Sequence, residues 1–399
     1  MDRFFKYLTL TLFLPLWHLQ KLLPRKDNLW VFGAWNGQRF SDNSKYLFDY
    51  STENNDAIRA IWLTKNKEVL LKIRNQGKEC YFTNSLKGAY FSLKAKYIIV
   101  SSGKNDINKH FVNGAKLIHL WHGNPLKKIG LDDNYSSVNG FFYSKIVRYL
   151  FPMVYEFNYD YMVSNSEIFT PYMQSSYRMN IEQILETGCP RNDIFYSKTP
   201  DIYNTEIVKK FKDSKIVYYL PTFRNSAIPT NIFTQEDYDE DELETFLQKE
   251  NMVLVNKGHF VESKKGVTTS SQDSRIIHLK DSDIISDINF MLKDADALIT
   301  DYSSAFFDFL LTERPIIFSA FDLEEYMSQS RELYFVYENA ISGPMAKNWN
   351  DILFHLKHIW DDDKNMELVK QKNVVYNKYH DANNSKRVMN AIMDLTKSK

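Results

Sequence analysis

The sequence predicts an α/β protein made of two doubly wound, Rossmann-like domains that face a cleft. Short apolar runs alternate with helical patterns along almost the whole chain, which is typical of parallel sheets covered by helices. The 399 residues exceed the roughly 250–300 at which a single hydrophobic core stops growing. Apolar residues make up 44% and charged residues 25%, as in ordinary globular proteins, so we expect two globular domains.

The strand-like runs fall into two sets, one in each half of the chain. Their members are 29–35, 58–64, 96–102, 116–122 and 161–166, then 215–221, 252–259, 275–280, 297–303 and 315–320. The joint is expected near GCPRND (188–193), where Gly and Pro interrupt the pattern. We therefore expect a first domain over 29–195 and a second over 196–399.

The N-terminal segment 4–23 is apolar and aromatic, but Pro15 and His18 interrupt it, which argues against a helix that spans a membrane. The segment carries Trp17, which three basic residues follow in the chain: Lys21, Arg25 and Lys26. This combination favours an interfacial helix, within residues 1–28, that lies on an anionic membrane. A second aromatic and basic stretch, 141–157, is expected to add to the same surface. The alternative for both segments is packing against the first domain.

Charge and cysteine content exclude some classes of protein. Lys plus Arg and Asp plus Glu both number 50, so global charge gives no argument for a nucleic-acid partner. The two cysteines, Cys80 and Cys189, lie far apart without metal-ligand spacing, and we expect two small buried side chains in a reducing compartment.

In doubly wound domains, ligands bind beyond the carboxyl ends of the strands, so polar residues that follow strands are candidate site residues. The first cluster is WHGNPLKKIG (121–130), in which His122 ends an apolar strand at a sharp turn. The side-chain pKa of histidine lies near neutrality, so His122 is a candidate general base for an alcohol. Asn124 and the two lysines Lys127 and Lys128 are candidate phosphate or acceptor contacts. The alternative is a structural histidine.

Three further clusters follow strands in the second half. YLPTFRNS (219–226) presents Arg224, whose guanidinium can bind phosphate oxygens bidentately, and NKGHF (256–260) presents Lys257 and His259. In ITDYSSAFFDFLL (299–311), Ser303 or Ser304 caps a helix whose free N–H groups attract anions. The alternative for this turn is a plain N-cap.

These motifs, with FDLEEY and DANNSKRV, together resemble the CDP-glycerol glycerophosphotransferases of teichoic acid synthesis over about residues 29–390. The resemblance implies a GT-B type fold and a peripheral enzyme at the cytoplasmic face of the membrane, with a lipid-linked (undecaprenyl-diphosphate) glycan as acceptor. It implies catalytic roles for His122 and His259. It also implies that four residues of the second domain contact the donor: Arg224, Asp301, Ser303 and Ser304. Lys257 is a further candidate donor contact from its position after a strand.

Two departures from the family pattern bear on the substrate. Asn124 stands where Thr is more common, and Gly258, His259 and Phe260 replace a Leu-His-Pro-like sequence, which leaves the choice of polyol open. The chain also lacks the long N-terminal extension of the polymerising members, which favours a single-addition, primase-like role.

The expected reaction is transfer of glycerol phosphate from CDP-glycerol to a hydroxyl, with CMP released. No DxD-type carboxylate pair follows a strand, so no metal or other cofactor is expected. The alternatives are CDP-ribitol as donor, a nucleotide-sugar glycosyltransferase of the same fold, and an inactive scaffold at the membrane surface. Intact His122, His259 and DYSS residues argue against the scaffold.

Overall fold

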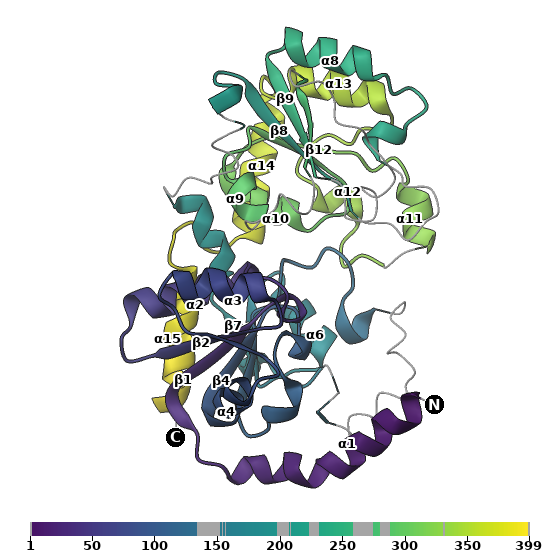
Figure 1. The fold of residues 1–399 in the computed structure, drawn as a ribbon. Helices are drawn as coiled ribbons and strands as arrows, with labels where there is room; N and C mark the ends of the chain where they lie inside the picture. Colours follow the sequence, from purple (N-terminus) through teal and green to yellow (C-terminus); the bar gives the residue numbers. More distant parts are fainter. Residues whose placement is uncertain are drawn as a thin grey trace. The chain divides into compact units, whose positions relative to one another are not determined.

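The computed structural model describes residues 2–133, 152–153, 155, 157–197, 207, 209–222, 231–257, 274–279, 288–329 and 332–397. The chain divides into two compact units (Figure 1). The first unit contains residues 1–122, 129–193 and 381–399, and the second contains 123–128 and 194–380.

The first unit is a seven-stranded parallel sheet in the order β3-β2-β1-β4-β5-β6-β7. Its strands are β1 (Lys26–Gly33), β2 (Arg59–Thr64), β3 (Cys80–Phe82), β4 (Ala95–Val100), β5 (Lys116–His119), β6 (Tyr161–Ser164) and β7 (Ile184–Glu186). Its described helices are α1 (Asp2–Leu19), α2 (Asp42–Asn54), α3 (Lys67–Asn75), α4 (Leu86–Lys94), α6 (Thr170–Tyr177) and α15 (Asn384–Lys397).

Both faces of this sheet are covered, which explains why its strands are apolar at nearly every position. Alternate residues such as Trp30 and Phe32 pack with α2, α3 and α15. Their neighbours in the same strand, Leu29 and Val31, are also buried.

The second unit is a five-stranded parallel sheet in the order β10-β9-β8-β11-β12. Its strands are β8 (Lys215–Leu220), β9 (Met252–Asn256), β10 (Ile276–His278), β11 (Ala297–Thr300) and β12 (Ile316–Phe318). Its described helices are α8 (Glu240–Lys249), α9 (Ile288–Leu292), α10 (Ala305–Phe309), α11 (Leu323–Gln329), α12 (Tyr337–Ala340), α13 (Trp349–His358) and α14 (Asp363–Tyr376). One face of the sheet packs against α8 and α13 through a core centred on Trp349.

The prediction of two doubly wound α/β domains is confirmed, and each of the ten predicted strands corresponds to an observed one. The edge strands β3 and β7 of the first sheet were not predicted. The two cysteines are free and buried, as expected.

The predicted domain ranges need a correction at the C-terminus. Residues 381–399 belong to the first unit instead of the second, and the yellow ribbon of α15 lies among the purple and blue elements in Figure 1. The reason is that α15 is amphipathic and buries Val388, Met389 and Ile392 in the core of the first sheet. The short segment 123–128 departs from the prediction in the opposite direction, because it belongs to the second unit.

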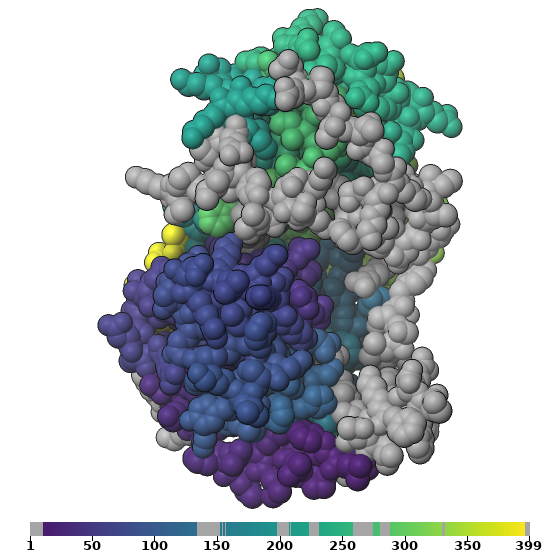
Figure 2. Space-filling view, viewed as in Figure 1, coloured from purple at the N-terminus to yellow at the C-terminus, as the bar shows by residue number. Residues whose placement is uncertain are grey.

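Helix α1 lies on the surface of the first unit, where Figure 2 shows it in purple. Trp17 is buried against Met153, and its carbonyl accepts a hydrogen bond from the Asn113 side chain at 2.8 Å. Gln20 donates to the His110 carbonyl at 2.7 Å. No helix in the described part of the chain is long and apolar enough to cross a membrane.

Candidate active site

The order of strands in the first sheet locates its ligand-binding edge. The chain runs from β1 through β2 to β3 on one side and continues from β4 through β7 on the other, so the order reverses between β1 and β4. Ligands of open α/β sheets bind beyond the carboxyl ends of the strands at such a reversal. In this unit the residues at that point are 34–37, after β1, and 101–106, after β4.

The carboxylate of Asp106 fills this position. Oδ2 of Asp106 accepts hydrogen bonds from the N–H groups of Ser101, Ser102 and Gly103 at 3.1, 2.8 and 3.3 Å, and Oδ1 accepts from Asn36 N–H at 2.7 Å. Asp106 is fully buried, and this burial raises its pKa to about 6 despite the four donors. The anion site of the first sheet is therefore occupied by the protein's own carboxyl group.

His122 lies three residues beyond His119, the last residue of β5, on a turn formed by Trp121 at φ 59° and Gly123 at φ 140°. Its Nδ1 is 3.2 Å from the Ser101 carbonyl oxygen. Because a carbonyl oxygen only accepts, Nδ1 must carry the hydrogen, and the neutral imidazole then has its lone pair on Nε2. This tautomer and orientation suit a general base.

His119, three residues earlier, shows what a structural histidine looks like in this fold. It is fully buried, stacks on Tyr159 at 4.4 Å between ring centroids, and places Nε2 3.1 Å from the same Ser101 carbonyl oxygen. Burial lowers its pKa to about 3, so it remains neutral. His122 is only partly buried, so the two histidines differ in access to solvent.

The loop before His122 is held by a buried amide that the sequence analysis did not identify. Asn43, near the start of α2, donates to the carbonyl groups of Leu120 and Trp121 at 3.2 and 2.9 Å, and its Oδ1 accepts from Arg191 N–H at 3.0 Å. An asparagine that satisfies three backbone groups fixes the path of this loop.

Arg191, within the GCPRND motif, holds the histidine from the other side. Its Nη1 donates to the His122 carbonyl oxygen at 2.7 Å and to Asp42 Oδ1 at 3.2 Å. Both Arg191 and Asp42 are buried, so this is a buried ion pair that contacts the backbone of the candidate base.

The chain passes from the first unit to the second between His122 and Gly123. Within the second unit, Lys128 N–H donates to the Glu332 carbonyl at 2.7 Å, and the two side chains form an ion pair. Lys127 lies with its ammonium 5.2 Å from the centroid of the Tyr326 ring. Both lysines are candidate phosphate contacts. Of the two, Lys128 is therefore paired with a carboxylate.

Asn124 is buried, with 1% of its surface exposed, and neither atom of its side-chain amide has a hydrogen-bond partner within the described part of the chain. Buried amides are normally paired, so an unpartnered one in a candidate site is a notable feature. It is compatible with the predicted contact role of Asn124.

In the second sheet the order reverses between β8 and β11. Thr222, after β8, donates its N–H to Asp301 Oδ1, after β11, at 2.8 Å. Lys257 follows β9, the other neighbour of β8, and its N–H donates to the Tyr219 carbonyl at 3.0 Å. The predicted residues Lys257 and Asp301 thus lie at the carboxyl ends of strands that flank β8.

The DYSS turn begins at Asp301 and leads into α10. Ser303 Oγ accepts from Ala305 N–H at 3.3 Å, so Ser303 rather than Ser304 is the capping side chain. Tyr302 stacks on Tyr326 at 3.9 Å and donates to Asp322 at 2.9 Å. Ser303 and Ser304 are both partly exposed.

Two predicted residues, Arg224 and His259, lie outside the described residues, as do Gly258 and Phe260. Most of the stretch 141–157 lies outside them too. Among the residues that are described, no group of three or more His, Cys, Asp or Glu side chains is arranged to hold a metal ion.

Two doubly wound domains with polar residues beyond the carboxyl ends of their strands are typical of the GT-B type fold. The chain belongs to the CDP-glycerol:poly(glycerophosphate) glycerophosphotransferase family, whose model matches residues 16–394. This confirms the resemblance inferred from the motifs.

Among similar proteins, the teichoic acid glycerol-phosphate transferase of Staphylococcus aureus is 31% identical over 386 residues, which cover 93% of this chain and 94% of that protein. The teichoic acid ribitol-phosphate primase of Bacillus spizizenii is 28% identical, with 94% and 93% covered. The structure of the wall teichoic acid polymerase TagF superposes with a TM-score of 0.74 at 23% identity, with 94% of this chain and 90% of that one covered.

Proposed function

We propose that this protein transfers glycerol phosphate from CDP-glycerol to a hydroxyl of a lipid-linked cell-envelope glycan precursor and releases CMP. The observation that carries the proposal is the family match over residues 16–394, together with relatives of nearly the same length that act in teichoic acid synthesis. The oriented histidine supports a transfer reaction that begins at a hydroxyl.

In the proposed reaction the acceptor hydroxyl attacks the β-phosphorus of CDP-glycerol in line with the departing group. A new O–P bond forms, the bond from the β-phosphorus to the bridging oxygen breaks, and CMP leaves with that oxygen. Nε2 of His122 takes the hydroxyl proton, while the Nδ1–H donor to the Ser101 carbonyl keeps the ring in place. Phosphoryl-type transfer depends mainly on such positioning and on charge neutralisation.

The donor diphosphate is proposed to bind at the carboxyl edge of the second sheet. Lys257, Ser303 and Ser304 supply donors there, and Asp301 holds the ends of β8 and β11 together. The corresponding point of the first sheet is already filled by Asp106, which favours the second unit for an anionic ligand. Arg224 and His259 remain predicted donor-site residues, and Asn124 and Lys127 remain predicted contacts.

The protein is further proposed to act at the cytoplasmic face of the membrane as a peripheral protein. Leu12, Leu16 and Leu19 of α1 recur at a helical spacing and are 73%, 59% and 55% exposed. An exposed apolar stripe of this kind partitions into the interface of a bilayer. Arg25, however, does not serve this surface as predicted, because its guanidinium donates to three backbone carbonyl groups, those of Ser92, Ala95 and Asn113.

CDP-ribitol is the second candidate donor. Relatives named as ribitol-phosphate enzymes match the chain at 24–28% identity, and the same strand-end residues would serve either polyol.

The test is CMP release with CDP-glycerol, CDP-ribitol and UDP-sugars, compared side by side with a lipid-linked acceptor. The proposal requires release with CDP-glycerol in clear excess over the other donors. Preference for CDP-ribitol would replace the donor, and release of UDP from a UDP-sugar would replace the reaction class.

A further inference from the structure

One of the chain's seven tryptophans, all of which the structure describes, differs from the others in its exposure to solvent. Four are buried and two are partly buried, whereas Trp35 leaves 37% of its surface exposed. Tryptophan is a large apolar side chain that folded proteins bury on average. Trp35 follows the end of β1 by two residues, so this exposed indole lies at the carboxyl edge of the first sheet.

Trp35 is adjacent to the candidate base. The centroid of its indole lies 5.7 Å from that of the His122 imidazole, and the two ring planes are tilted by 54°. Trp121 also contacts the imidazole, at 4.2 Å between centroids, but it packs on the buried rings of His119 and Tyr177 as well. Of the two indoles beside His122, Trp35 is therefore the one more open to a ligand.

The backbone holds Trp35 in this position at a conformational cost. Trp35 and Asn36 have φ angles of 47° and 56°, in a region that residues other than glycine seldom adopt. Ser102 Oγ accepts a hydrogen bond from the Trp35 N–H at 3.3 Å. The N–H of Asn36 donates to Asp106 at 2.7 Å, and its carbonyl accepts from Lys65 Nζ at 2.8 Å. Backbone strain that is held from several sides is concentrated at functional sites.

Arg39 adds hydrogen-bond donors beside the indole. Its guanidinium carbon is 5.6 Å from the centroid of the Trp35 ring, and its side chain is exposed. A guanidinium carries five N–H donors in one plane. An aromatic ring with such donors next to it suits a ligand that has both an apolar face and hydroxyl groups.

A sugar ring is a ligand of this kind. The C–H groups on one face of a hexopyranose carry a slight positive charge, which complements the negative face of an indole, and the hydroxyl groups at its edge form hydrogen bonds. In the proposed reaction the attacking hydroxyl lies about 3 Å from Nε2 of His122. A sugar at that end of the acceptor is then within reach of Trp35, because the two side chains are neighbours.

We propose that Trp35 is the surface on which a sugar of the acceptor glycan stacks, and that Arg39 donates hydrogen bonds to the hydroxyl groups of this sugar. The inference rests on the proposed function and deepens it, because it assigns the acceptor glycan to a surface of the first unit. It gives Trp35 a role in binding and leaves the proton transfer to His122.

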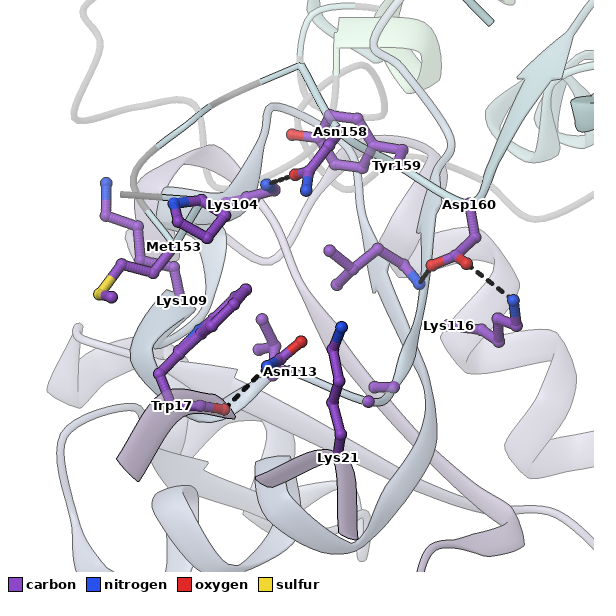
Figure 3. Close-up of a pocket in the computed structure, with 15 residues that line it drawn as sticks. Trp17, Lys21, Lys104, Lys109, Asn113, Lys116, Met153, Asn158, Tyr159 and Asp160 are labelled. Atoms are coloured by element: carbon purple, nitrogen blue, oxygen red, sulfur yellow. Dashed lines mark hydrogen bonds and ion pairs between the residues drawn. The ribbon is translucent and has the colours of Figure 1, made fainter. Parts of the chain in front are cut away.

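The cavity shown in Figure 3 is separate from this surface. It has a volume of about 330 Å³, and Trp17 of α1 and Lys116 are among the residues that line it. Lys116 begins β5, whereas His122 follows the end of that strand. The cavity therefore borders the start of β5, and we assign it no part in holding the acceptor glycan.

Binding of acceptor analogues in the absence of any donor tests the assignment. The probes are short-chain prenyl diphosphates that carry disaccharides of common envelope sugars, and the same prenyl diphosphates without sugar. Calorimetry should show about tenfold weaker binding of the best disaccharide probe to Trp35→Leu, which keeps apolar bulk but loses the flat face. Trp35→Phe, which keeps an aromatic face, should bind this probe nearly as well as the wild type. The sugar-free probe should bind equally to all three proteins.

The control removes an exposed aromatic ring elsewhere on the first unit. Tyr90, on α4, is 50% exposed, and Tyr90→Ala should bind every probe like the wild type. Normal binding of the disaccharide by Trp35→Leu, or an equal loss in Trp35→Phe, would overturn the stacking role. Equal weakening of the sugar-free probe would replace the sugar with the lipid diphosphate. Wild-type protein that binds no disaccharide probe better than the sugar-free one would also overturn the proposal.

Steady-state kinetics separates a role in acceptor binding from one in donor binding. In Trp35→Leu the KM for the disaccharide acceptor should rise by about tenfold, while kcat and the KM for CDP-glycerol stay within about threefold of the wild type. A rise in the KM for CDP-glycerol alone would assign the indole to the donor and overturn the proposal. The binding experiment uses no donor, so a wild-type protein that releases no CMP would count against the proposed function, and the binding result would still decide the role of Trp35.

Discussion

The carboxyl edges of the two sheets are built in opposite ways. At the first edge the backbone N–H groups are satisfied by Asp106, and the reactive feature is a histidine ring held by a carbonyl. At the second edge Asp301 accepts a hydrogen bond that ties the ends of β8 and β11 together, and one lysine and two serines follow β9 and β11. The difference suggests how two parallel sheets with the same kind of strand order can divide a transfer reaction: in our proposal the first edge, already occupied by a carboxylate, carries the base, and the second edge holds the donor.

The largest expected effect comes from the first edge. His122→Ala should lower CMP release by about 10²–10⁴-fold, the usual cost of removing a general base. Binding of CMP, measured by calorimetry, should stay close to that of the wild type because the donor is proposed to bind to the other unit. A variant that turns over at a near-normal rate would remove His122 from the mechanism.

The next prediction concerns the ion pair that supports His122, whose loss should lower the stability of the protein. Arg191→Ala removes one partner of a buried ion pair with Asp42, which costs about 3–5 kcal/mol of unfolding free energy. Denaturant unfolding measures this loss. Adding Asp42→Asn should recover part of it, because the second change removes the buried charge that Arg191 had balanced; no recovery would mean that the ion pair is not the cause.

Asp106 should give the first edge a distinctive pH dependence. Its pKa is about 6 in the folded protein and about 3.9 in an unfolded chain, so the folded state binds this proton more tightly. The group therefore stabilises the fold most below pH 4 and loses that contribution as pH rises to 6, at about 1.4 kcal/mol per pKa unit. Asp106→Asn should remove this slope from unfolding free energies measured between pH 4 and 6. An unchanged slope would show that Asp106 is not the titrating group.

The smallest effect is expected at the second edge, where several groups share the charge of the donor. Ser303→Ala with Ser304→Ala should weaken binding of CDP-glycerol by about tenfold, the value of one hydrogen bond to a charged group. Calorimetry measures the change, and Ser328→Ala, on the exposed α11, is the matched control. Normal binding by the double variant would place the diphosphate elsewhere.

Which elements the sequence could predict depends on how far apart in the chain the interacting residues lie. The inner strands were predictable because both their faces are buried and their residues are apolar without interruption. β3 and β7 have three residues each, too few to show a pattern. α15 follows the second domain along the chain, and only the burial of Val388 and Ile392 in the first core reveals where it belongs.

The same reasoning applies to the site. His122, Lys257 and Ser303 could be proposed from the sequence because each comes shortly after an apolar strand. Asn43 and Asp106 were missed, since they act on loops that lie 77 and as many as 70 residues away in sequence, and nothing in their neighbours signals this. Arg191 stands within a recognised motif, but its bond to the His122 carbonyl exists only in the folded chain.

Chemical rescue tests the central claim, that His122 is the base of the transfer, most directly. Imidazole should restore CMP release to His122→Ala with saturation, and the rate should increase with pH as imidazole loses its proton, because the neutral ring is the form that accepts the hydroxyl proton. A variant that binds CDP-glycerol normally and yet shows no rescue at any imidazole concentration or pH would contradict the account.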